Sequence, residues 1–120
     1  DGNHSGARSK SEALLQELGL GHRLNHLPNQ LSAGEKQRVA LARAMVASPD
    51  LILADEPTGN LDPENSKEVC RHLKRYQEKG GTVIVVTHGD AVHDFANRTI
   101  DLKAGEIIPG PLLDHQADEA

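Results

Sequence analysis

An apolar run passes directly into two acids within residues 51–62, which read LILADEPTGNLD. Pro49 precedes this run and Pro57 follows it closely, so there is room for a short strand and not for a helix. Further along the chain, residues 82–87 read TVIVVT, a β-branched run without polar alternation that predicts a strand covered on both faces. One helical pattern separates the two runs. Two strands joined by one helix form a βαβ unit, so the predicted fold class is α/β with parallel strands.

Signals for helix ends mark the elements around these strands. Ser32 and Glu35 form a capping box, which predicts the start of a helix. Asp62 followed by Pro63 predicts another start, because proline at the first helical position lacks an N–H that would have no partner there. The elements expected from the pattern are helices at 11–18, 33–47, 63–79 and 90–96 and a small hairpin of 99–103 with 106–108.

The chain divides into four segments by composition. Residues 1–10 are rich in Gly, Ser and Asn and are expected to form a mobile leader at the edge of the chain. Residues 11–48 form a helical segment, and residues 49–109 form the α/β part. Residues 110–120 contain acids but no Lys or Arg, and we expect a mobile acidic tail there.

Composition bounds the class of protein. The chain has 120 residues, of which 37% are hydrophobic and 26% are charged, as in globular domains. Its formal net charge of −5 favours neither nucleic acid nor anionic lipid as a direct partner. Its uninterrupted apolar runs are far shorter than the ~20 residues of a membrane-spanning helix, so no transmembrane segment is expected. Cys70, the single cysteine, excludes an intrachain disulfide and suits a reducing compartment.

Polar side chains follow both predicted strands. Asp55 and Glu56 come directly after the first strand, and Thr87 and His88 end the second. A right-handed crossover places the carboxyl ends of both strands on one edge, where ligands of open parallel sheets bind. Acids, a hydroxyl and an imidazole there indicate a site for Mg²⁺ and phosphate, with one acid for the metal and one for proton transfer. The alternative is a solvated strand end, with His88 as a hydrogen-bonded turn residue.

The predicted helix start at residues 31–35, LSAGE, is the second candidate site. Free N–H groups and the positive end of the helix dipole allow such an N-terminus to hold a phosphate oxygen. The alternative is plain N-capping, which the capping box already explains. This helix precedes the first strand, so the sequence gives no reason for its N-terminus to face Asp55 and Glu56.

Three segments together resemble one family: LSAGEKQRVALARAM at 31–45, LILADEPTGNLD at 51–62 and VVTHGD at 85–90. They stand in the order and at the spacing of ATP-binding-cassette (ABC) ATPases. The sequence ADEPTGNLD, residues 54–62, is particularly similar to that of the bacterial subgroup of lipoprotein-release, macrolide-export and cell-division ATPases. The resemblance covers about residues 12–108. It implies the C-terminal half of a P-loop NTPase-type ABC fold, with parallel core strands, flanking helices and part of the helical subdomain.

The resemblance implies roles for individual residues, with ATP and Mg²⁺ as cofactors. Asp55 would organise Mg²⁺ through water, Glu56 would polarise the attacking water, and His88 would contact the γ-phosphate. Asp62, with its two preceding residues, would couple two sites across a dimer. The signature residues that would hold the γ-phosphate of ATP on the opposite subunit are Ser32, Ala33, Gly34, Glu35 and Gln37.

Three departures from the family pattern stand out. Ala33 replaces the usual glycine, and Gly89 separates His88 from Asp90. The phosphate-binding pattern G-x-x-x-x-G-K-[ST] does not occur, so the Walker A half is absent from the sequence. We therefore expect these 120 residues alone neither to bind nor to hydrolyse ATP measurably.

The resemblance implies an ABC transporter ATPase subunit that pairs with a second copy and drives an integral membrane permease. Such a subunit is cytoplasmic and peripheral on the inner face of the cell membrane. Two alternatives stay open: an ATPase of a non-transport system, in cell division or associated with DNA, and a non-catalytic module that acts by pairing.

Overall fold

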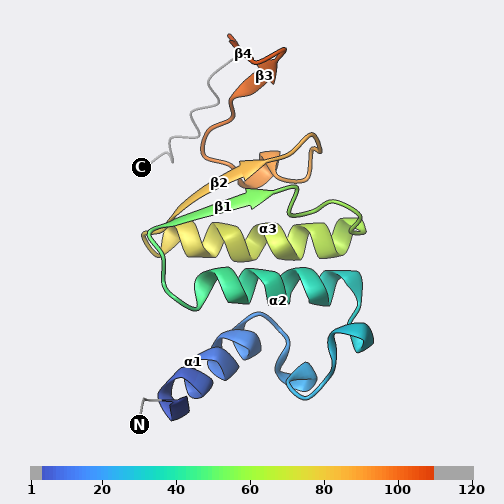
Figure 1. The fold of residues 1–120 in the computed structure, drawn as a ribbon. Helices are drawn as coiled ribbons and strands as arrows, with labels where there is room; N and C mark the ends of the chain where they lie inside the picture. Colours follow the sequence, from blue (N-terminus) through green and yellow to red (C-terminus); the bar gives the residue numbers. More distant parts are fainter. Residues whose placement is uncertain (1–3, 110–120) are drawn as a thin grey trace, which may run out of the picture.

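The computed structural model describes residues 4–109. Helix α3 lies between helix α2 and a pair of strands, and α1 lies on the far side of α2 (Figure 1). In chain order the elements are α1 (His4–Glu17), η1 (Gly21–Arg23), η2 (Pro28–Gln30), α2 (Ala33–Met45), β1 (Leu51–Asp55), α3 (Pro63–Glu78), β2 (Thr82–Val86), η3 (His93–Phe95), β3 (Asp101–Lys103) and β4 (Glu106–Ile108).

Strands β1 and β2 pair in parallel, with Leu51 opposite Thr82 and Asp55 opposite Val86. Helix α3 connects them, so the predicted α/β class with parallel strands is confirmed. Apolar side chains of the helices pack under one face of this sheet. The buried core consists of Leu18, Leu41, Ala42, Met45, Ile52, Val69 and Leu73.

Only one face of the sheet is covered by the part of the chain that the structure describes, so the prediction of strands covered on both faces is wrong. Ile52 on the helix side is 4% exposed, whereas Leu53 and Val86 on the other side are 71% and 61% exposed. Successive side chains of a strand point to opposite faces, and α3 packs against only one of them. The β-branched run correctly predicts a strand, but it does not indicate which elements cover the second face of that strand.

Helix α1 starts at His4, so the expectation of a loop over residues 1–10 is wrong for the described residues 4–10. The ion pair of Arg8 with Glu12, at 2.8 Å, and the hydrogen bond from Ser11 Oγ to the Ala7 carbonyl stabilise the additional turns. Residues 1–3 and the predicted acidic tail at 110–120 lie outside the described residues.

The other local predictions hold with small changes. Ser32 caps α2 through a capping box, and Pro63 is the first residue of α3. The helix expected at 90–96 is only the 3₁₀ turn η3. The predicted hairpin forms as β3 and β4, whose residues are all exposed, and it extends away from the helices (Figure 1).

Candidate functional site

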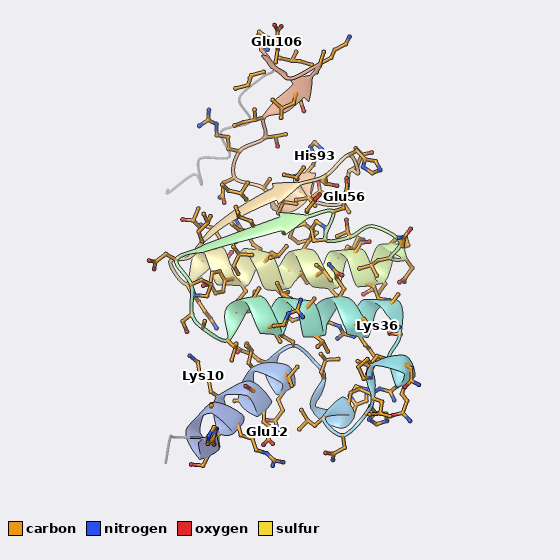
Figure 2. All side chains as sticks on the ribbon, in the orientation of Figure 1. Lys10, Glu12, Lys36, Glu56, His93 and Glu106 are labelled. Carbon is orange, nitrogen blue, oxygen red and sulfur yellow. The ribbon has the colours of Figure 1, made fainter. Side chains whose placement is uncertain are left out.

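Glu56 and His88 meet at the carboxyl ends of β1 and β2, the edge at which they were expected. The backbone N–H of His88 donates to Glu56 Oε1 at 2.9 Å, and its ring Nδ1 contacts the same oxygen. Thr87 Oγ1 donates to Glu56 Oε2 at 3.1 Å. Figure 2 shows Glu56 just beyond the arrowheads of the strands. Parallel pairing thus brings together groups that are 32 residues apart in the sequence.

The backbone at Glu56 has a left-handed conformation, with φ of 47°. Non-glycine residues adopt this region rarely, and strained residues concentrate at functional sites. The Glu56 N–H donates to the Val86 carbonyl at 2.7 Å, which continues the strand pairing by one residue before the chain turns. The turn directs the carboxylate of Glu56 toward the end of β2.

The environment keeps Glu56 ionised at neutral pH. Partial burial pushes its pKa upward, but hydrogen bonds from the His88 backbone, the Thr87 hydroxyl and the His88 ring outweigh burial and lower it below the ordinary value. The Glu56 side chain is 34% exposed and the His88 side chain 93% exposed. The imidazole is therefore open to an incoming ligand, with the carboxylate behind it.

Asp55, the predicted metal residue, is exposed at the last position of β1. Strand alternation places it on the open face of the sheet, with Leu53. No group of three or more His, Cys, Asp or Glu side chains within residues 4–109 is arranged to hold a metal ion. A single carboxylate is still compatible with Mg²⁺, which commonly keeps several waters and uses one or two protein carboxylates together with phosphate oxygens.

The predicted signature residues divide into exposed and buried ones. Ser32 and Ala33 are exposed at the N-terminus of α2, and Gln37 is half-buried. Gly34 and Glu35 are buried. A ligand approaching this helix end therefore meets the backbone of the first two residues before it meets the others.

The carboxylate of Glu35 is fully engaged with other parts of the chain. It accepts hydrogen bonds from the Ser32 N–H at 3.0 Å and from Arg23 Nε at 2.8 Å. The Ser32 backbone bond, followed by that of Arg23, lowers the pKa of Glu35 to about 2. His22 Nε2 lies 3.6 Å from the same carboxylate. The role of Arg23 was not expected from the sequence, since no motif links this residue, at the end of η1, to α2, which begins ten residues later.

The two clusters lie at the same end of the molecule. The strands β1 and β2 point toward this end, and α2 and α3 both begin there (Figure 1). Within the described residues, the hydrogen bonds to the Glu56 carboxylate come from Thr87 and His88, and those to Glu35 from Ser32 and Arg23. The clusters therefore form two separate sites and share no hydrogen bond.

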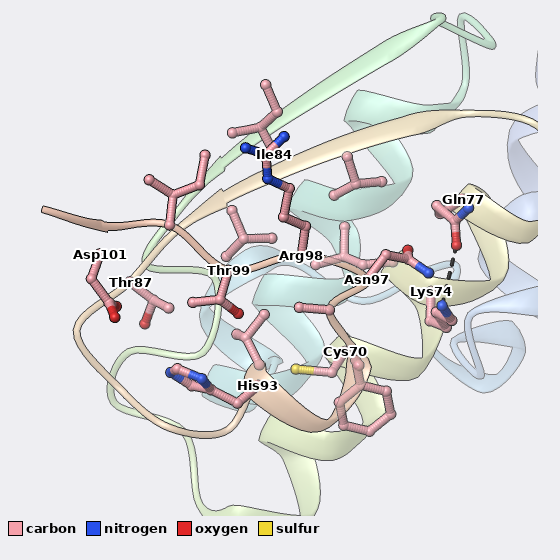
Figure 3. A pocket seen from close by; sticks show the side chains of 17 residues that line it. Cys70, Lys74, Gln77, Ile84, Thr87, His93, Asn97, Arg98, Thr99 and Asp101 are labelled. Carbon is pink, nitrogen blue, oxygen red and sulfur yellow. Dashed lines mark hydrogen bonds between the residues drawn. The ribbon is translucent and has the colours of Figure 1, made fainter. Parts of the chain in front are cut away.

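A cavity of about 430 Å³ lies beside the free edge of β2. Residues of α3, including Cys70, and the extended segment 97–101 form its other walls, and Figure 3 shows Cys70 and His93 at its η3 end. Burial raises the pKa of Cys70, so its thiol is not activated. Thr87 lines this cavity and also bonds Glu56, but neither Glu56 nor His88 lines it.

Comparison with known proteins relates the chain to a family. The family model described as "ABC transporter" matches residues 3–59. The lipoprotein-releasing system ATP-binding protein LolD of Geobacter metallireducens is 49% identical over 105 residues, which are 87% of this chain and 47% of that protein. The macrolide export ATP-binding/permease protein MacB of Shewanella oneidensis is 50% identical over 101 residues, 84% of this chain and 15% of that protein. The chain belongs to the ABC transporter ATP-binding family.

Solved ABC cassettes share the fold of this ABC chain. An ATP-binding cassette determined as a dimer, in a post-hydrolysis state bound to ADP and Pi, is 42% identical, with a TM-score of 0.75 over 89% of this chain and 47% of that one. The ADP conformation of another ATP-binding cassette gives a TM-score of 0.82 at 25% identity, over 89% of this chain and 42% of that one. The ABC chain thus spans at most about half the length of the relatives that it matches.

Among residues 4–109, no helix has both the length and the apolar character needed to cross a membrane. The longest of these helices, α3, has 16 residues and contains several charged side chains.

Proposed function

We propose that this chain carries the hydrolytic carboxylate, the switch histidine and the signature motif of an ABC transporter ATPase, and that it acts within a cassette of the length of its relatives. The observation that supports this most directly is the meeting of Glu56 and His88 at the carboxyl edge of β1 and β2. Ligands of open parallel sheets bind at this edge. The relationship to LolD and to MacB adds support for ATP as the ligand.

The donor set fits Mg²⁺ and a terminal phosphate. Oxygen ligands suit Mg²⁺, and Asp55 offers an exposed carboxylate beside Glu56. Mg²⁺, when bound, neutralises charge on the phosphate oxygens. Asp55 would be the residue that holds the metal, through water. Glu56, ionised and oriented by Thr87 and His88, accepts a hydrogen bond from water, and the exposed His88 ring contacts a γ-phosphate oxygen.

The N-terminus of α2 serves a second nucleotide in this proposal. At the positive end of the helix dipole the exposed residues present the hydroxyl of Ser32 and the backbone N–H of Ala33, which suit a phosphate of ATP on the opposite subunit. Gln37 stands one turn further along the helix. The separation of this cluster from Glu56 agrees with a role toward another molecule. The dimeric state of the solved cassette bound to ADP and Pi supports pairing with a second copy, in which Asp62 couples the two sites.

The proposed setting follows from the relatives. LolD and MacB are described as parts of a lipoprotein-releasing system and a macrolide exporter. We propose that the cassette is cytoplasmic and peripheral on the inner face of the cell membrane, and that its partner is an integral membrane permease. No nucleic acid is expected as a direct ligand, since the chain carries a net charge of −5.

The substitution Glu56→Gln in the full-length cassette tests the role of the carboxylate. Gln keeps the size of the side chain but binds a proton far less readily, so ATP turnover should fall by ~10²- to 10⁴-fold. Binding of a fluorescent ATP analogue should stay within twofold of the wild type. Glu78→Gln, an exposed change at the end of α3, is the matched control and should leave turnover unchanged. Turnover by Glu56→Gln at the wild-type rate would reassign the base.

A further inference from the structure

The N-terminal turns of α2 and α3 come into contact where buried Gly34 meets half-buried Asn65. Gly34 is buried, and a Cβ atom built on it would lie 2.6 Å from Asn65 Cγ and 3.1 Å from Asn65 Cβ. Carbon atoms that are not bonded attract best at about 3.5–4.0 Å, so the first of these separations is strongly repulsive. The side chain of Asn65 thus occupies the space that any larger residue at position 34 would need.

A second contact fixes Asn65 in place. Its Nδ2 donates a hydrogen bond to Asp62 Oδ1. Asp62 has the extended backbone of an N-cap residue, with φ of −65° and ψ of 162°, yet its side chain makes no capping bond to the backbone of α3. The carboxylate of Asp62 is directed to Asn65 instead. Asn65 therefore connects the loop that ends at Asp62 with the first turn of α2.

We infer that Asn65 is a positioning residue that sets the spacing between the phosphate-facing end of α2 and the loop ending at Asp62. This inference rests on the proposed function, since it assigns a purpose to the spacing. It also gives a structural reason for the glycine at position 34, which is contact with Asn65 and not contact with a ligand. The exposed residues of the motif, Ser32 and Ala33, face a ligand, whereas Gly34 is buried against Asn65.

Unfolding of the 120-residue chain tests the contact itself, with Gly34→Ala, Asn65→Ala and the double variant. Overpacking a well-filled site is destabilising, so Gly34→Ala should lower the folding equilibrium constant by roughly 5- to 150-fold. Removal of the Asn65 amide opens the space. In the Asn65→Ala background, Gly34→Ala should therefore lower the folding equilibrium constant by less than twofold. Equal losses in both backgrounds, measured by urea denaturation, would overturn the contact.

Kinetics of the full-length cassette test the positioning role. Asn65→Ala leaves every proposed ligand-contacting group in place but loosens the end of α2. We expect kcat/KM for ATP to fall by ~10-fold or more, since misplacement by about 1 Å can cost ~10²-fold. The loss should appear in KM with kcat unchanged, because α2 serves binding and not proton transfer. A structural role alone would lower the unfolding midpoint and leave KM at the wild-type value, which would contradict the inference.

The double variant, Gly34→Ala with Asn65→Ala, distinguishes two reasons for the glycine at position 34: space for Asn65 or space for a phosphate. If Asn65 excludes a side chain, the methyl group that Gly34→Ala introduces refills part of the space emptied by Asn65→Ala, and KM should return toward the wild-type value relative to Asn65→Ala alone. If a phosphate needs the space, KM should rise further, and the inference fails. A wild-type cassette that shows no ATP turnover would refute the proposed function but leave the unfolding test of the contact intact.

Discussion

The left-handed backbone of Glu56 leads to a prediction that isolates strain at the candidate site. Glu56 adopts a φ of 47° directly after β1. Glu56→Ala and Glu56→Gly both remove the carboxylate and its bonds to Thr87 and His88. The two variants differ only in the Cβ atom, which is the atom that disfavours this backbone region. A comparison of them therefore measures the conformational cost at this residue without the hydrogen bonds.

Two opposing effects determine the expected difference in the free energy of unfolding between Glu56→Gly and Glu56→Ala. A left-handed conformation costs a residue with a Cβ atom ~1–2 kcal/mol. Glycine avoids this cost but loses ~0.5–1 kcal/mol through the greater freedom of its unfolded chain. Glu56→Gly should therefore be more stable than Glu56→Ala by about 0.5–1 kcal/mol, a factor of roughly two to five in the unfolding equilibrium.

Urea denaturation followed by far-ultraviolet circular dichroism measures this difference, provided that the two variants have equal m-values. Lys67, an exposed residue with regular helical geometry in α3, supplies a matched control pair. There the order should reverse, because glycine in a helix interior is ~1 kcal/mol less favourable than alanine. If Glu56→Ala is as stable as Glu56→Gly while the Lys67 pair reverses as expected, the left-handed conformation of Glu56 is refuted.

Two further predictions concern the packing around the sites. Ile52→Ala should destabilise the chain by ~2–5 kcal/mol, whereas Leu53→Ala, on the open face, should change stability by at most ~0.5 kcal/mol; chemical denaturation distinguishes these outcomes, and equal losses would contradict the open face. The pKa of Glu35 is lowered to about 2, so its hydrogen bond from the Ser32 N–H and its ion pair with Arg23 stabilise the fold fully above pH 4.5, its ordinary pKa, and this contribution is lost as the pH falls from 4.5 to about 2. Glu35→Gln should remove that part of the acid sensitivity, seen as a smaller drop in the urea midpoint between pH 5 and pH 2, and an unchanged drop would show that other groups cause it.

Local signals in the sequence were sufficient for most elements. The capping box of Ser32 and Glu35 involves residues three positions apart, and the structure contains both of its hydrogen bonds. Pro63 begins α3 for a reason confined to one residue. The parallel pairing of β1 and β2 was accessible because a single helix between two apolar runs restricts the topology strongly. The meeting of Glu56 with His88 follows from that topology.

The remaining features depend on contacts between distant segments. The open face of β1 and β2 reflects which elements pack against the sheet, and a strand pattern contains no such information. Arg23, the last residue of η1, contacts Glu35 at the start of another helix, and no sequence pattern links the two positions. Asn65 reaches Gly34 from another helix, 31 positions along the chain. The start of α1 at His4 was missed because Gly, Ser and Asn in the first ten residues suggest a loop, although an ion pair one helical turn apart stabilises the helix.

The signature motif is divided between surface and interior, so its positions should respond differently to substitution. A helix N-terminus binds an anion through N–H groups that must keep a fixed direction, so the residues that follow must be anchored. Ala33 supplies an exposed N–H and Ser32 an exposed hydroxyl, while Glu35 is held by Arg23 and by the Ser32 N–H, and Gly34 lies against Asn65. A methyl group at position 33 projects into space open to solvent, whereas at position 34 it would overlap a side chain tied to Asp62. The two small residues of the motif are therefore small for different physical reasons, and substitutions at them should differ in whether folding or ligand binding suffers first.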